Sequence, residues 1–242
     1  MIDRSLNYGR PLIKLFLQES GPYQTVLDLG AGGGDDLRLA REVCPQSKLY
    51  GIEVHPEYAR KLSAGGIKVY GLNIEKDRLP FGDGTVDVVI INQVLEHTKE
   101  VFWIFHEISR VLSAGGTLIL GIPNMAALHN RILLAFGKQP SPCKTNSAHV
   151  RGFTKGDILN FLESCAPGVY QLMGFGGANF YPFPPFIARP LALLFPTMAW
   201  GIFFRLKKLK GYERGFVDFP LVQSLETNFY LGAQKLRQKK KK

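Results

Sequence analysis

Four glycines within five positions follow a short apolar run near the start of the chain, and they constrain the fold more than any other feature. The stretch VLDLGAGGGDD covers residues 26–36, with Asp28 inside the run and Gly30, Gly32 and Gly34 in the turn. Glycine is used where φ must be positive or where a missing Cβ lets another group approach. A glycine-rich turn between a strand and a helix presents free N–H groups beside a crevice. The stretch therefore predicts a ligand site at the end of a buried strand.

Apolar strand-like runs alternate with helical patterns over the first half of the chain. Helices are expected over residues 35–43, 56–64 and 100–112. Strands this apolar, separated by helices, are typical of a parallel sheet covered on both faces. The sequence therefore predicts an α/β fold with a doubly wound, mostly parallel sheet, whose first strands lie over residues 25–29, 48–52, 67–70, 86–91 and 117–121.

Length and composition indicate one soluble domain with an insertion. The chain has 242 residues, of which 45% are hydrophobic and 21% charged. No apolar run follows a basic N-terminal start, so we expect a cytoplasmic protein. The three cysteines have no C-x-x-C spacing, and they are too few for a disulfide framework or a zinc site. We therefore expect no bound metal.

The glycine spacing also limits the class of ligand. A dinucleotide fingerprint would need a glycine at position 35, where the chain has Asp35. The carboxylates of Asp28, Asp35 and Asp36 would repel a pyrophosphate. The stretch instead favours a cofactor that carries a positive charge and an amino group and has no phosphate.

Four segments resemble, in order and spacing, the motifs of the class I S-adenosylmethionine-dependent methyltransferases. DLGAGGG is similar to the first motif of this family, and residues 50–55, 72–98 and 110–124 are similar to the later ones. The resemblance covers roughly residues 20–124 and is closest to the type-11 and ubiquinone-biosynthesis-like branch. It implies a seven-stranded, Rossmann-like methyltransferase fold and S-adenosylmethionine as the cofactor.

The resemblance assigns the cofactor contacts to residues at the ends of the first four strands. It places Asp28 near the amino-acid end of the cofactor and lets Glu53 accept from both ribose hydroxyls. Asn73 departs from the commoner aspartate, but its carboxamide oxygen can accept from the adenine amino group. The expected cofactor-binding residues are Asp28, Gly30, Ala31, Gly32, Gly34, Glu53, Val54, Asn73, Ile74, Asn92 and Gln93.

Three residues are expected to act on the acceptor side: His97, His149 and Arg151. His97 in LEHT matches a hallmark of the small-molecule branch, although Glu96 and His97 equally suit helix entry and packing, or an acid, base or metal role. His149 and Arg151 in SAHVRGFT stand just before a predicted capped helix, where similar enzymes build the wall of the acceptor site. There His149 can take a proton and Arg151 can hold an anionic acceptor. The alternative is that the pair ties down a long connection.

The pattern of residues along the chain divides it into five parts. Residues 1–24 form a leading helix, residues 25–124 the cofactor-binding core and residues 125–177 an acceptor-side segment. Residues 178–222 form an insertion rich in proline and aromatic residues, and residues 223–242 hold the last strand and a basic tail. This insertion therefore precedes the last strand of the predicted sheet.

The formal net charge of +10 is concentrated at the C-terminal end, where eleven Lys and Arg and only three acids follow residue 200. This bias suggests an anionic partner, either a membrane or a nucleic acid. No D-P-P-Y-like tetrapeptide follows the fourth strand, so a nucleic acid is the less favoured partner. We expect methyl transfer, by O-methylation, to a small-molecule or lipid-like acceptor. The alternative is a nucleic-acid or protein methyltransferase that uses the basic C-terminal region.

Residues 179–210 suggest contact with a membrane surface. Their longest uncharged apolar stretch has fifteen residues and contains Pro196, so it is shorter than the roughly 20 residues that span a bilayer. Cations follow this stretch and Trp200 lies within it, which matches an interfacial anchor on an anionic, peripheral membrane surface. The alternative is a hydrophobic cap over the acceptor pocket. The cations are Arg205, Lys207, Lys208 and Lys210.

Overall fold

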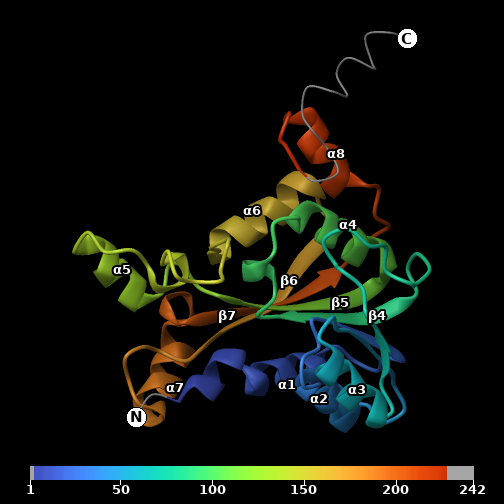
Figure 1. The fold of residues 1–242 in the computed structure, drawn as a ribbon, viewed down its shortest axis with the longest axis horizontal. Coiled ribbons are helices and arrows are strands. Elements are labelled where there is room, and N and C mark those ends of the chain that lie inside the picture. The colour runs from blue at the N-terminus through green and yellow to red at the C-terminus, as the bar shows by residue number, and fades with distance from the viewer. Residues whose placement is uncertain (1–2, 228–242) are drawn as a thin grey trace.

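The computed structural model describes residues 3–227 and has seven strands in one sheet (Figure 1). The first four strands lie within one residue of the apolar runs predicted for them, whereas the fifth begins five residues earlier than predicted. The first and fourth strands consist mostly of buried residues, as is typical of parallel strands covered on both faces. In chain order the strands are β1 (Thr25–Leu29), β2 (Lys48–Ile52), β3 (Lys68–Tyr70), β4 (Val86–Asn92), β5 (Leu112–Pro123), β6 (Tyr170–Ala178) and β7 (Gly201–Lys208).

The strand order is β3-β2-β1-β4-β5-β7-β6. The pairs from β3 to β5 are all parallel, whereas β7 runs antiparallel to both β5 and β6. The order in which strands are added to the sheet therefore reverses between β1 and β4, which is the position where doubly wound sheets bind ligands. The predicted mostly parallel, seven-stranded Rossmann-like fold is confirmed.

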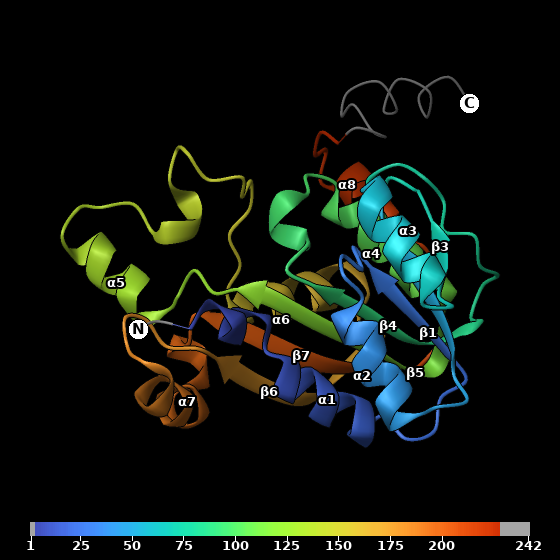
Figure 2. The ribbon, with the colours of Figure 1, turned by 60° about the horizontal axis from the view of Figure 1, so that its bottom comes forward.

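Helices cover both faces of the sheet, which gives three layers (Figures 1 and 2). Three helices lie on one face: α1 (Arg10–Glu19), α2 (Asp35–Val43) and α3 (Pro56–Ala64). Three lie on the other: α4 (Val101–Val111), α6 (Lys155–Cys165) and α8 (Gly215–Val222). Two more, α5 (Leu128–Ala135) and α7 (Pro185–Leu194), lie at the end of the molecule that also holds the carboxyl end of β5. Four short 3-10 helices complete the order: η1 (Arg4–Tyr8), η2 (Leu95–His97), η3 (Ser141–Cys143) and η4 (Pro196–Met198).

The capped helix predicted after residue 154 is α6. The Thr154 hydroxyl accepts from the Asp157 N–H at 3.3 Å, and the Asp157 carboxylate accepts from the Thr154 N–H at 3.2 Å. A reciprocal pair of this kind satisfies two backbone donors at a helix start. It fixes the point at which the loop before α6 rejoins the fold, and this loop carries His149.

The interfacial anchor predicted over residues 179–210 is wrong for residues 201–208. These residues form β7, whose backbone pairs with β5 and β6 on its two sides. Phe203 and Phe204 are fully buried, and Lys208 is 3% exposed. The Lys208 amine donates to the carbonyls of Ser109 and Leu112 at 2.7 and 2.6 Å. It therefore satisfies carbonyls at the C-terminal end of α4 and is not available to lipid headgroups.

The last strand was expected after residue 222, but the seventh strand of the described chain is β7, within the predicted insertion. The end of that insertion forms α8, where Phe216 packs against Phe105 of α4 with ring centroids 5.5 Å apart. Most of the predicted last strand and the whole lysine tail fall within residues 228–242, outside the described part of the chain. Among residues 3–227, no helix is long and apolar enough to cross a membrane.

Candidate functional site

The glycine turn after β1 has the backbone that its sequence predicts. Gly30, Gly32 and Gly34 have φ values of +76°, +50° and +78°. A Cβ on Gly30 would lie 2.5 Å from the Val94 side chain, and one on Gly34 would lie 2.4 Å from Leu62. A Cβ on Gly32 would meet nothing nearer than the Gly30 carbonyl oxygen at 4.0 Å. Two of these glycines are therefore required by packing, whereas Gly32 borders open space that a ligand can fill.

Glu53 stands at the end of β2 beside this turn. Its carboxylate accepts from the Gly32 N–H at 2.8 Å and from the His55 N–H at 2.7 Å. A carboxylate has about four acceptor positions, so about two remain for the hydroxyls of a ribose. The next residue, Val54, leaves 68% of its side chain exposed, which is unusual for an apolar residue at the end of a buried strand. Both residues fit the predicted cofactor contacts.

Buried carboxylates give the turn a strongly acidic environment. Asp28 is 3% exposed, and burial raises its pKa well above the usual value, with the nearby Asp36 and Glu53 raising it further. Burial also raises the pKa of Asp36. A positive charge in this space would favour the ionised carboxylates. The electrostatics therefore fit the sulfonium and amino groups of S-adenosylmethionine.

A link between the leading segment and the cofactor turn was not predicted. Arg10 at the start of α1 pairs with Asp35 and also lies 3.8 Å from Asp36, both in the first turn of α2. The Asn92 amide donates to the Asp36 carboxylate at 2.8 Å and to the Tyr8 carbonyl at 3.1 Å. These groups come from three separate regions, and no local motif signals their meeting. Their contacts hold η1 over the end of β4.

Asn73 follows β3, so it lies at the carboxyl ends of the parallel strands, as Glu53 does. Its side-chain oxygen accepts from the Glu75 N–H at 2.9 Å, and its own N–H donates to Asp77 at 2.8 Å. The oxygen keeps a second acceptor position, so the adenine contacts of Asn73 and Ile74 stay a prediction. Gln93 after β4 has φ +56°, and its N–H donates to the Gly121 carbonyl at 2.8 Å.

A cavity of about 380 Å³ opens beside the glycine turn. It includes Gly30 of the turn, so a cofactor bound there and an acceptor in the cavity would be adjacent. The first turn of the chain, the end of β4 and two more distant loops all contribute to its wall. The lining residues are Arg4, Asn7, Tyr8, Gly30, Asn92, Gln93, Glu96, His97, His149 and Trp200.

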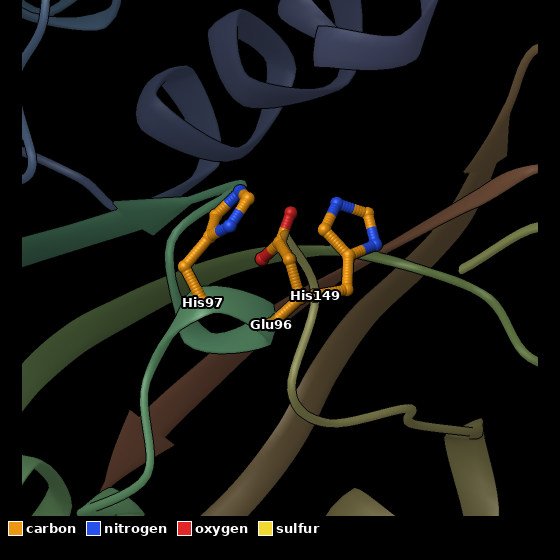
Figure 3. Close-up of side chains that lie close together, drawn as sticks. All are labelled: Glu96, His97 and His149. Atoms are coloured by element: carbon orange, nitrogen blue, oxygen red, sulfur yellow. The ribbon is translucent and has the colours of Figure 1, made fainter. Parts of the chain in front are cut away.

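The structure brings His97 and His149 together although 51 residues separate them. The Glu96 carbonyl accepts from the Val150 N–H at 2.8 Å and from the Arg151 N–H at 3.3 Å, which ties the loop before α6 to η2. The two imidazole rings lie edge to face with centroids 4.8 Å apart. Figure 3 shows both rings beside the Glu96 carboxylate.

Burial changes the protonation of this cluster. Glu96 is 2% exposed, and burial raises its pKa to about 7. The pKa of His149 is lowered, first by burial and then by the neighbouring His97. From the sequence, Glu96 was weighed with His97 for helix entry and packing or for an acid, base or metal role, and its burial inside the cavity wall is a property of the folded chain.

Arg151 does not line the cavity. Its guanidinium donates to the Lys99 carbonyl at 2.6 Å, and its side chain is exposed. This contact supports the alternative weighed for it, in which the residue ties down the connection between β5 and α6. Arg4 is the cation that lines the cavity.

Glu53→Ala should weaken S-adenosylmethionine binding by roughly 10- to 100-fold. Hydrogen bonds to a charged group contribute about 1.5–3 kcal/mol, which corresponds to this range of affinity. Isothermal titration calorimetry measures the dissociation constant, and thermal unfolding checks that the variant is folded. Glu57→Ala on the exposed face of α3 is the control and should bind as the unaltered chain does. Unchanged affinity in Glu53→Ala would contradict the ribose assignment.

Comparison with known proteins identifies the domain. A family described as "Methyltransferase domain", of the type-11 group, matches residues 27–120. The chain is 36% identical over 124 residues to an arsenite methyltransferase of Halobacterium salinarum, covering 49% of this chain and 31% of that protein. It is 28% identical over 130 residues to a demethylmenaquinone methyltransferase of Thermus thermophilus, covering 50% and 58%. The chain thus spans less than two thirds of each of these relatives.

A solved structure shows the same fold over most of the chain. The S-adenosylmethionine-dependent methyltransferase of Mesorhizobium loti superimposes with a TM-score of 0.56 at 20% identity, covering 82% of this chain and 96% of that one. The matched family, the sheet order and the glycine turn agree with one another. The chain therefore carries a class I S-adenosylmethionine-dependent methyltransferase domain of the type-11 group, and S-adenosylmethionine is the cofactor of this domain.

Proposed function

We propose that the chain transfers a methyl group from S-adenosylmethionine to a hydroxyl of a small hydrophobic or lipid-like acceptor. The observation that carries this proposal is the cavity that contains both Gly30 of the cofactor turn and the cluster of Glu96, His97 and His149. Tyr8 and Trp200 add aromatic surface to the same wall. Such a cavity suits the hydroxyl-bearing end of an acceptor, which the polar cluster can contact while Tyr8 and Trp200 border its apolar part.

The residues of the chain have separate parts in this reaction. S-adenosylmethionine, when bound, supplies a methyl group on a positively charged sulfur. The hydroxyl oxygen bonds to the methyl carbon, and the electrons of the carbon–sulfur bond return to sulfur. The hydroxyl proton passes to His149, whose Nδ1 is buried without a partner. Because positive charge disappears from the cofactor, orientation and exclusion of water supply much of the rate, and a base adds to it.

The acceptor identity is tested by incubating the full chain with labelled S-adenosylmethionine and fractionated cell extracts. We expect label in the small-molecule or lipid fraction, in a bond that resists treatments that cleave methyl esters. RNA, DNA and protein fractions run in parallel, because the basic C-terminal region favours them as the alternative acceptors. Label confined to a macromolecular fraction would overturn the proposed acceptor class.

We further propose that this enzyme works at an anionic membrane surface, through an apolar surface that keeps the α7 part of the predicted segment 179–210 and adds α5. The α5–α7 surface consists of exposed apolar side chains in or directly after α5 and α7, two helices that lie at one end of the molecule (Figures 1 and 2). Leu193 is the most exposed at 80%, and Leu128 of α5 packs against the buried alanines of α7. Its residues are Ile132, Leu134, Phe136, Phe186, Leu193, Leu194 and Phe195.

The charges around this surface support an anionic partner. Residues 108–156, which include α5, contain no Asp or Glu, and neither do residues 164–212, which include α7. Exposed Arg131, Lys138 and Arg189 lie in or next to these two helices. Within these two stretches the apolar side chains are accompanied by cations and by no acids, as is typical of helices that lie in the interface of an anionic bilayer.

Replacing Phe186, Leu193 and Leu194 by Ser should weaken attachment to phosphatidylserine-containing vesicles by at least about tenfold. Burying each of these side chains is worth about 1.5–3 kcal/mol at most, so partial immersion of three exceeds one factor of ten. Vesicle flotation at low salt measures the bound fraction. Val222→Ser, on an equally exposed residue of α8, is the control and should bind normally. An unaltered chain that stays off these vesicles would contradict the membrane proposal.

A further inference from the structure

Glu96, His97 and His149 place three metal-ligating atoms close together in the acceptor cavity. One carboxylate oxygen and one nitrogen from each ring lie within 4.8 Å of one another. In Figure 3 the carboxylate stands between the two rings, and all three side chains rise on the same side of η2. They come from η2 and from the loop before α6, which the Glu96 carbonyl holds in place.

Two atoms of the cluster are buried without a hydrogen-bond partner: Glu96 Oε2 and His149 Nδ1. A buried polar atom left unpaired costs about 1–3 kcal/mol, so native proteins seldom retain one without a ligand, a water or a functional reason. Glu96 is almost completely buried, because only 2% of its surface is exposed. The unpaired Glu96 oxygen therefore points to a ligand that the cluster is built to receive.

The third side chain, His97, is oriented by a backbone carbonyl. Its Nδ1 lies 3.3 Å from the Ala148 carbonyl oxygen. A carbonyl only accepts, so this contact places the proton on Nδ1 and leaves the lone pair on Nε2. Histidines that bind metals commonly donate their other ring N–H to a carbonyl or carboxylate in this way.

We propose that Glu96, His97 and His149 bind one divalent transition-metal cation in the acceptor cavity. Two imidazoles and one carboxylate with an open fourth position are a ligand set that catalytic zinc sites use. Imidazole nitrogen favours zinc, cobalt or iron over magnesium, which prefers oxygen ligands. Ligand atoms about 2.1 Å from a tetrahedral ion lie about 3.4 Å apart, so the widest pair must close by about 1.4 Å. Rotation of the exposed His97 ring and the half-buried His149 ring can supply this closure.

This inference rests on the proposed function for its part in turnover. The acceptor hydroxyl takes the open position of the cation, which favours loss of its proton. That proton then passes to solvent water instead of to His149, and the oxygen still bonds to the methyl carbon. Because Gly30 lines the same cavity, the cation would hold the hydroxyl toward the cofactor turn. The metal site itself requires no acceptor and can be measured alone.

The test uses the untagged full chain, freed of metal by a chelator and then titrated with Co²⁺, Zn²⁺ or Mg²⁺. We expect one Co²⁺ or Zn²⁺ per chain by calorimetry, a visible Co²⁺ absorption band from nitrogen and oxygen ligands, and at least tenfold weaker binding of Mg²⁺. Absence of Co²⁺ and Zn²⁺ binding below millimolar concentrations would overturn the site.

Single variants locate the ion. Glu96→Gln, His97→Ala and His149→Ala should each weaken Co²⁺ binding by at least about tenfold. His97 is exposed, so its variant remains informative if a buried one fails to fold. His129→Ala is the matched control, because His129 is also half-buried with an unpartnered nitrogen but lies in α5, outside the cluster. Co²⁺ binding that survives both Glu96→Gln and His97→Ala would overturn the assignment.

Cofactor affinity separates this inference from the proposed function. A chain that binds S-adenosylmethionine but no Co²⁺ or Zn²⁺ keeps its proposed function and loses the metal site. A chain that binds the metal ion at the cluster but neither binds S-adenosylmethionine nor transfers methyl groups keeps the site and loses the function.

Discussion

Gly32→Val should reduce S-adenosylmethionine binding by at least about 1,000-fold, an effect of about 4 kcal/mol. A side chain at this position enters the open space beside the turn, because the nearest atom to its Cβ is 4.0 Å away. That space adjoins the Glu53 carboxylate, which accepts from the Gly32 N–H. A branched side chain there would therefore occupy the place of the cofactor. Calorimetry at high protein concentration measures the remaining affinity.

The control for Gly32→Val must carry the same backbone strain, because Gly32 has φ +50° and a branched residue is disfavoured there. Gly66 meets this need, because its φ is +74° and nothing lies within 4 Å of an added Cβ. It precedes β3, at the amino ends of the parallel strands, whereas the glycine turn lies at their carboxyl ends. Gly66→Val should lose stability in thermal unfolding and keep cofactor affinity. Equal loss of affinity in both variants would show that strain, and not occupation of the cofactor space, explains the result.

The elements around the cofactor were predictable because their signals are local. β1, α2, β2 and α3 have the bounds that the sequence predicts. Each strand is a short apolar run, and each helix begins just after a glycine or at a proline. Glu53 and the glycine turn lie on these elements, so their meeting follows from parallel pairing of β1 with β2.

β7 was missed because its signals are not local. Its sequence GIFFRLKK follows several prolines and ends in cations, which favours a surface segment. The strand is defined by partners far away in sequence, since Ile202 pairs with Ile122 of β5 and with Gly177 of β6. The buried Lys208 amine is stabilised by two backbone carbonyls, 96 and 99 residues earlier in the chain, that accept its hydrogen bonds. No periodicity within residues 201–208 contains that information.

The acceptor side was predictable in part. The resemblance supplied His97 and His149, and the structure places both in one cavity. The burial of Glu96, the pairing of Arg10 with the start of α2 and the turn of Arg151 toward Lys99 all depend on contacts between separate loops. The contacts of side chains on long connections could therefore be found only in the folded chain. The positions of side chains at strand ends could be predicted from the sequence.

His149→Ala should lower methyl-transfer turnover by about 10²–10⁴ and leave cofactor affinity nearly unchanged. The imidazole lines the same cavity as Glu96, and the proposed roles of base or metal ligand both require it. The loop does not depend on the ring, because the Val150 N–H and the Arg151 guanidinium fasten it through backbone carbonyls. Turnover is measured with the acceptor identified by labelling, and calorimetry measures cofactor binding.

Ser147→Ala separates the chemistry of the His149 ring from the order of its loop. The Ser147 hydroxyl accepts from the His149 N–H at 3.2 Å, so this change loosens the loop and keeps the imidazole. If the ring acts on the acceptor proton, Ser147→Ala should lower turnover by less than about tenfold, whereas His149→Ala should lower it by at least about 100-fold. Similar losses in both variants, or a parallel loss of cofactor affinity, would show that His149 only holds the loop. Added Co²⁺ or Zn²⁺ should not restore His149→Ala, because the variant lacks one of the three proposed ligands of the cation.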